Sequence, residues 1–114
     1  MHELSMMCAL VEQVEDLAVK ESFDRVYEIR VSVGALSGVE PSSLEFCFTE
    51  ATQGSVLSGA RLILQSVGVE LSCLSCGELS NPSDPAALIC TNCQSPNVKI
   101  CKGREFKVEE MEVE

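Results

Sequence analysis

The chain is 114 residues long and carries a formal net charge of −10, from 8 basic and 18 acidic residues. This length allows one modest core and a small satellite module. A hydrophobic content of 46% is that of a folded protein, while the negative field repels nucleic-acid phosphates. Because no apolar run is long enough to cross a bilayer, the composition predicts a cytoplasmic protein without nucleic-acid or membrane partners.

The N-terminal segment is patterned as an amphipathic helix that follows Met1-His2-Glu3. Its apolar residues recur at steps of three and four, which places them on one face of a helix. They are Leu4, Met7, Cys8, Val11, Val14, Leu17 and Ala18. Because Cys8 lies on this stripe, it is predicted to be a small buried residue.

A strand, a second helix and a second strand are predicted to follow. Residues 25–33 alternate between apolar and polar side chains, as in a strand that is buried on one face. Pro41 is placed to open a helix at its first turn, and Gly54 is placed to end it. Residues 60–67 form the next apolar run, which predicts the second strand.

The last predicted strand covers residues 104–113, and its alternation changes midway. A β-bulge at residues 109–110 would bring four apolar side chains to the core face. These side chains are Phe106, Val108, Met111 and Val113.

Two C-x-x-C pairs, Cys73/Cys76 and Cys90/Cys93, are separated by thirteen residues. The two-residue gap lets both sulfurs of a pair point at one ion, and the spacing is typical of one tetrahedral, four-cysteine zinc site. A disulfide framework or a redox-active C-x-x-C would use the same residues. A closed site of this kind leaves no position for a water nucleophile. Cys101 is interpreted as a strand residue and not as a ligand.

The order of elements predicts an α/β (α+β) fold, with two helices packed on a small three-stranded mixed sheet. A four-cysteine zinc-ribbon module is inserted between the second and third strands. The predicted domains are residues 1–69 with 98–114, and residues 70–97. The predicted core comprises Val11, Val14, Leu17, Ile29, Val31, Leu44, Phe48, Leu62, Leu64, Phe106 and Val108.

The single histidine is the second residue, His2. Its backbone nitrogen and imidazole Nδ1, with the α-amine of Met1, can close fused chelate rings around one ion. Such a planar nitrogen array suits Ni(II) or Cu(II) and suits zinc poorly. Glu3 could supply a fourth donor, and Glu40 is an outer candidate. Without a second imidazole, no Ser/His/Asp or Cys/His catalytic arrangement is available, so the chain is predicted not to be an enzyme.

Four parts of the chain also carry a family resemblance: the opening MHELS, VGALSGVEP at residues 33–41, the two C-x-x-C pairs, and the closing EEMEVE. In this order they resemble the HypA/HybF nickel metallochaperones of hydrogenase maturation. The resemblance implies nickel bound through His2 with Glu3 beside it, and structural zinc held by the four cysteines. It also implies transfer of nickel to the large-subunit precursor of a nickel–iron hydrogenase, with a GTPase of the same pathway. The chain could act as a monomer or a homodimer.

Two other functions would use the same residues. A zinc-ribbon adaptor would bind one zinc and ignore nickel. A thiol oxidoreductase would titrate reversibly at its cysteines without bound metal. Metal titration separates these from a nickel chaperone, which binds both metals at different sites.

Overall fold

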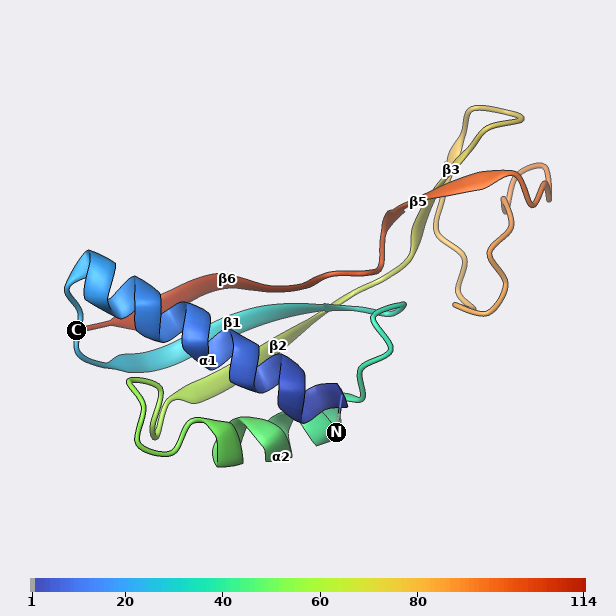
Figure 1. Cartoon of the computed structure of the whole chain (residues 1–114). Coiled ribbons are helices and arrows are strands. Elements are labelled where there is room, and N and C mark those ends of the chain that lie inside the picture. The colour runs from blue at the N-terminus through green and yellow to red at the C-terminus, as the bar shows by residue number, and fades with distance from the viewer. Residues whose placement is uncertain (1) are drawn as a thin grey trace. The chain divides into compact units, whose positions relative to one another are not determined.

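A computed structural model describes residues 2–114, and the chain forms two compact units. Figure 1 shows the course of the chain through them. Unit 1 consists of the chain up to Val31, Val39–Leu64 and Val108–Glu114. Unit 2 consists of Ser32–Gly38 and Gln65–Lys107. None of the helices in the described residues is long and apolar enough to span a membrane.

Helix α1 (His2–Glu21) begins two residues before the predicted start, so His2 and Glu3 belong to its first turn. Its buried residues are Met7, Leu10, Val14 and Ala18. Cys8 is exposed and Leu17 is 37% exposed, so the prediction that both face the core is wrong. The observed stripe also follows steps of three and four, and only the neighbouring elements decide between two such overlapping stripes.

Helix α2 (Pro41–Ala51) opens with Pro41 in its first turn, as predicted. Leu44 and Phe48 are its buried residues, whereas Cys47 is half-buried. The helix ends three residues before Gly54. The two helices therefore supply unit 1 with aliphatic and aromatic core residues at the predicted three- and four-residue steps.

The first sheet joins three strands in the order β2-β1-β6. They are β1 (Val26–Gly34), β2 (Arg61–Val67) and β6 (Phe106–Val113). The N–H of Glu114 donates to the Arg25 carbonyl, so the end of β6 lies beside the start of β1 and the two strands are antiparallel. The N–H of Ala35 donates to the Val67 carbonyl, which joins the ends of β1 and β2 and makes them parallel. The predicted mixed sheet is confirmed.

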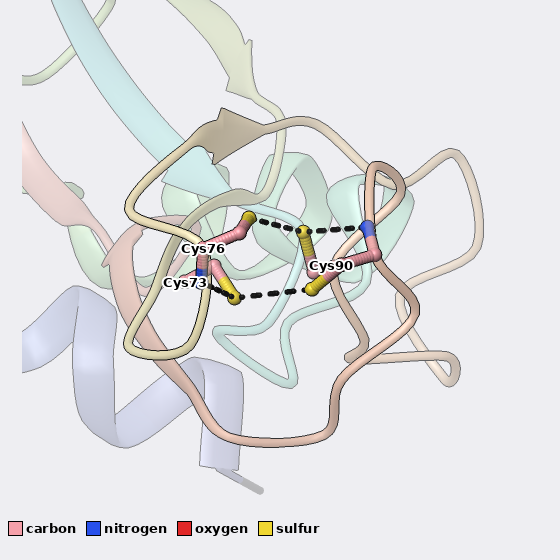
Figure 2. Close-up of side chains that lie close together, drawn as sticks. Cys73, Cys76 and Cys90 are labelled. Carbon is pink, nitrogen blue, oxygen red and sulfur yellow. Dashed lines mark hydrogen bonds between the residues drawn. The ribbon is translucent and has the colours of Figure 1, made fainter.

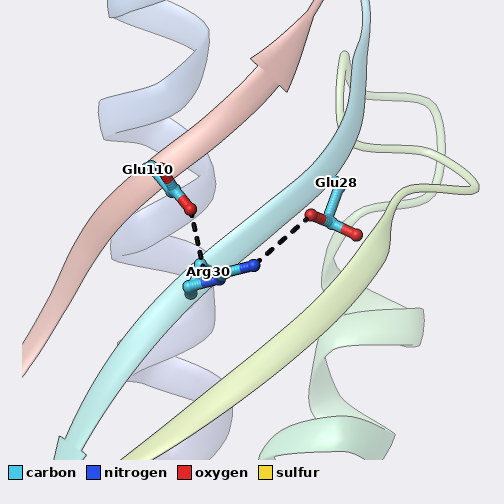
Figure 3. Close-up of polar contacts among 3 residues, drawn as sticks. All are labelled: Glu28, Arg30 and Glu110. Atoms are coloured by element: carbon cyan, nitrogen blue, oxygen red, sulfur yellow. Dashed lines mark ion pairs between the residues drawn. The ribbon is translucent and has the colours of Figure 1, made fainter.

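An ion pair links the antiparallel strands β1 and β6 in unit 1 (Figure 3). Arg30 Nη1 lies 3.0 Å from Glu110 Oε1, and Arg30 Nη2 lies 3.9 Å from Glu28 Oε2. The Glu110 side chain is 65% exposed, so water screens the pair, which contributes about 0–1 kcal/mol.

Unit 2 contains a second three-stranded sheet, which the hydrophobic pattern did not predict. Its order is β4-β3-β5, and β3 pairs antiparallel with both neighbours. The strands are β3 (Glu70–Cys73), β4 (Leu79–Ser80) and β5 (Val98–Lys102). Two- to five-residue strands give little periodic signal. Cys101 lies in β5 and outside the metal-binding cluster, as predicted.

Burial confirms part of the predicted core. The buried members are Val14, Ile29, Val31, Leu44 and Phe48. The half-buried members are Val11, Leu62, Leu64, Phe106 and Val108. Four of these lie on β2 and β6, which are the edges of their sheet and have a neighbouring strand on one side only. Met111 is half-buried, but Val113 is 44% exposed, so the prediction that all four apolar residues of β6 face the core is wrong.

Candidate metal centre

The four cysteines of the C-x-x-C pairs converge in unit 2, and Figure 2 labels three of them. Their sulfurs all lie within 4.8 Å of one another. The closest are Cys73 Sγ to Cys93 Sγ at 3.6 Å and Cys76 Sγ to Cys90 Sγ at 3.7 Å. A tetrahedron with metal–sulfur bonds of about 2.3 Å has edges of about 3.8 Å, whereas a disulfide needs about 2.05 Å. The cluster therefore fits four ligands around one ion.

The two C-x-x-C segments fold alike around this cluster. The Cys73 carbonyl accepts a hydrogen bond from the N–H of Gly77 at 3.0 Å, and the Cys90 carbonyl accepts one from Gln94 at 2.8 Å. Gly77 has φ 79° and Gln94 has φ 64°, so each segment curls back through the left-handed region. Glycine suits that region, and Gln94 adopts it at some conformational cost. Both sulfurs of each pair are thereby directed to the same point.

Backbone N–H groups lie against two of the sulfurs. Those of Ser75 and Cys76 are each 3.3 Å from Cys73 Sγ, and that of Cys93 is 3.4 Å from Cys90 Sγ. These donors, Cys76 foremost, lower the pKa of Cys73 to about 6. The N–H of Cys93 likewise lowers the pKa of Cys90. Both side chains are therefore biased toward thiolate, the form that binds metal.

Cys93 has the opposite bias. The N–H of Ser95 lowers its pKa, but the neighbouring sulfurs of Cys73, Cys76 and Cys90 outweigh that donor and raise the pKa of Cys93 to about 12. Thiolates this close together repel one another, so the last proton leaves when a cation neutralises the group. The arrangement is that of a cation site that binds metal with release of protons.

The sequence did not single out the residues that surround the cysteines. Asn92 Nδ2 lies 3.6 Å from Cys76 Sγ, and the hydroxyls of Ser75 and Ser95 are 3.0 Å apart. Ser75 and Asn92 occupy the same position within their C-x-x-C segments. That shared position, held by a polar residue in both segments, is the signal that could have identified them.

The N-terminal residues predicted to bind nickel lie in unit 1. His2 is exposed and Glu3 is half-buried, and the α-amine of Met1 lies outside the described residues. The backbone N–H of Glu3 itself, and then that of Glu40, lower the pKa of the Glu3 carboxyl. Glu3 is thus held as a carboxylate near the start of α2. Within residues 2–114, no third cysteine, histidine or acidic side chain joins His2 and Glu3 in a metal-binding cluster, so the nickel ligand set stays a prediction.

These features define a small α+β metal-binding protein with a four-cysteine centre in one unit and an exposed N-terminal histidine in the other. The model of one protein family, described as HypA, hydrogenase/urease nickel incorporation, metallochaperone, matches residues 1–113. The chain belongs to this HypA family of nickel-incorporation metallochaperones.

Similar proteins match this chain over all or nearly all of its length. The hydrogenase maturation factor HypA of Methylocella silvestris is 40% identical over 114 residues, which cover 100% of both chains. That of Aquifex aeolicus is 33% identical, with 100% of this chain and 98% of its own covered. The solution structure of the Ni metallochaperone HypA from Helicobacter pylori has a TM-score of 0.74 at 27% identity, over 97% of this chain and 96% of that one. The resemblance seen in the sequence is confirmed.

Proposed function

We propose that this chain binds Ni(II) at its N-terminus through His2, with Glu3 and the α-amine of Met1 as further donors. It then delivers the nickel to the precursor of a nickel–iron hydrogenase. Membership of a nickel-incorporation family supports nickel as the cargo. The observation that carries the site is the position of the only histidine, which is exposed in the first turn of α1.

The first turn of a helix suits backbone nitrogen ligands. The first four N–H groups of an α-helix have no partner within the helix. The amide nitrogens of His2 and Glu3 can therefore lose their protons to a metal without breaking a helical hydrogen bond. The positive end of the helix dipole repels a cation, and the carboxylate of Glu3 together with the deprotonated amides offsets that repulsion. A planar set of amine, amide and imidazole nitrogens is a set that Ni(II) prefers.

We also propose that the four-cysteine centre holds structural zinc. Four sulfur donors at tetrahedral spacing fill the coordination sphere of zinc and leave no open position for chemistry. Residues 70–97 are then the zinc-binding domain, and residues 1–69 with 98–114 are the nickel-binding domain. The support is that Cys73 and Cys76 lie at the turn between β3 and β4, whereas Cys90 and Cys93 lie in the loop between β4 and β5. One ion would therefore connect two segments that are otherwise weakly paired.

Replacing His2 tests the nickel site. His2→Ala should abolish nickel binding and leave zinc in place, and His2→Gln should behave in the same way, because an amide side chain is a weak donor. Ser5→Ala, at an exposed position of the same helix, is the control. Nickel is measured by calorimetric titration and by the visible absorption of planar Ni(II), on protein with an unmodified N-terminus.

Blocking the α-amine separates a terminal chelate from a side-chain site. An N-terminal extension should weaken nickel binding even with His2 intact. If His2→Ala keeps the affinity of the unaltered chain, the terminal site is refuted. A chain that binds one zinc and no nickel would instead be a zinc-ribbon adaptor.

Two protein partners complete the proposal. The large-subunit precursor of a hydrogenase receives the nickel, and a GTPase of the same maturation pathway assists, both in the cytoplasm. Nickel-loaded chain mixed with purified precursor should transfer its metal faster than free Ni(II) at the same concentration, and the GTPase should increase the rate. Equal rates from the chain and from free Ni(II) would refute delivery.

A further inference from the structure

A surface groove lies within unit 1, between the first turns of α1 and the outer side of α2. It has a volume of about 470 Å³. Its lining includes Glu3, Leu4, Ser42, Phe46, Cys47 and Glu50. The groove begins one residue after His2, and Figure 1 shows the N-terminal end of α1 beside the start of α2.

Helix α2 presents a second face to this groove, with one exposed aromatic residue at its centre. Leu44 and Phe48 are buried on its inner face. Ser42, Phe46 and Glu50 are spaced by four residues and share another face. Phe46 is 70% exposed, whereas Phe23 and Phe48 are buried. A single exposed apolar residue needs no explanation, but an exposed aromatic beside Leu4 and Cys47 in a groove is typical of a protein interface.

Among the described residues, the charged side chains that line the groove have one sign. Both charged residues of the lining, Glu3 and Glu50, are acidic, and α2 contains no basic residue. Unit 2 contains four acidic residues, Glu70, Glu78, Asp84 and Glu105, and four basic residues, Lys99, Lys102, Arg104 and Lys107. These cancel, so the whole net charge of −10 belongs to unit 1. A basic partner is attracted to such a surface and an acidic one is repelled.

We propose that this groove docks a basic, amphipathic helical segment of a partner protein. Its apolar side chains pack against Leu4, Phe46 and Cys47, and its lysine or arginine side chains pair with Glu3 and Glu50. The exposed face extends over nine residues of helix from Ser42 to Glu50, or about 12 Å. This length suits the side-by-side contact of an amphipathic helix in a groove. Under the proposed function, on which this identification rests, the partner is a protein that exchanges nickel with His2.

A synthetic helical peptide of leucine and lysine is the probe, and a peptide of leucine and glutamate is its charge-reversed control. Both are added to zinc-loaded full chain without nickel. The lysine peptide should shift the amide resonances of Leu4, Phe46 and Glu50. It should also slow the alkylation of Cys47 several-fold, while Cys101, exposed in the other unit, reacts at an unchanged rate.

Matched variants assign the binding to the groove. Phe46→Ser should weaken the lysine peptide about tenfold, as loss of an aromatic anchor does. Val19→Ser, which removes another apolar residue that is 84% exposed on α1, should not. Glu50→Lys should weaken binding more than Glu12→Lys, which makes the same change in net charge at another exposed position.

Three results would overturn the proposal: equal binding of the glutamate peptide, equal effects of the paired variants, or shifts that lie outside the groove. Concentration-dependent shifts without peptide would show that a second copy fills the groove, which also overturns it. His2→Ala should leave peptide binding unchanged. Loss of nickel function with intact peptide binding, or the reverse, therefore shows which of the two proposals has failed.

Discussion

Replacing Gly34 by alanine tests the close backbone contact between the end of β1 and residues 103–105, which precede β6. A Cβ added at Gly34 would lie 2.1 Å from the Gly103 carbonyl oxygen and 2.7 Å from the backbone nitrogen of Arg104. Neither atom can rotate away, because both belong to the backbone. The two segments must therefore separate by about 1 Å to reach an ordinary contact.

That separation breaks two short backbone hydrogen bonds. The N–H of Gly34 donates to the Glu105 carbonyl at 2.7 Å, and the N–H of Leu36 donates to the Gly103 carbonyl at 2.6 Å. Each bond contributes about 1 kcal/mol net, and a buried group left without a partner costs about 1–3 kcal/mol more. These losses add to about 3–5 kcal/mol. Alanine gains roughly 0.4–1 kcal/mol by restricting the unfolded chain, so Gly34→Ala should destabilise by a net of about 2–5 kcal/mol.

Gly68→Ala is the matched control, because nothing lies within 4 Å of its added Cβ and its φ is not in the left-handed region. It should be neutral or slightly stabilising. Urea unfolding followed by circular dichroism, in reducing buffer with metal bound, gives the free energy of unfolding. Amide hydrogen exchange at Leu36 reports the local bond. If Gly34→Ala lies within about 0.5 kcal/mol of Gly68→Ala and Leu36 stays protected, the steric reasoning is refuted.

Three further predictions concern a phenol, a leucine pair and the metal. The Tyr27 hydroxyl donates to Glu114 Oε1 at 2.6 Å, and this hydrogen bond raises the pKa of Tyr27. An absorbance titration of the only tyrosine should therefore have a midpoint above the ordinary value for a phenol. Glu114→Gln should lower that midpoint. The stability from this contact is complete below the pKa of the unfolded phenol and is lost as pH rises through the raised pKa. Leu71→Ala removes a fully buried side chain and should lower the free energy of unfolding by about 2–5 kcal/mol. Leu79 is 63% exposed on the adjacent strand, so Leu79→Ala should change it by less than about 0.5 kcal/mol. Equal costs would contradict the assigned burial. If the four cysteines hold zinc as proposed, its chelation should remove amide protection from β3 and β4 and leave that of α1 and α2 intact, as NMR hydrogen exchange can show. Protection lost equally throughout the chain would contradict this.

The sequence alone determined those features that depend on chemistry local to a few residues. Two C-x-x-C segments supply four sulfurs to one ion wherever the module sits, so Cys73, Cys76, Cys90 and Cys93 could be predicted from spacing. Pro41 fixes its own backbone angle and thereby sets the start of α2. A mixed sheet could also be predicted, because a helix between the first two strands allows a parallel pair, but the strand order β2-β1-β6 could not.

Tertiary structure decided which residues are covered. Leu10 is buried in place of Cys8 and Leu17 because two stripes of equal periodicity overlap on α1, and the packing against α2 helps to select one of them. The second sheet depends on pairings between short strands that carry no period of their own. The low pKa of Cys73 and the high pKa of Cys93 arise from backbone N–H groups and from sulfurs up to twenty residues away. These pKa shifts depend on distances in space between the groups, and the sequence alone does not give those distances.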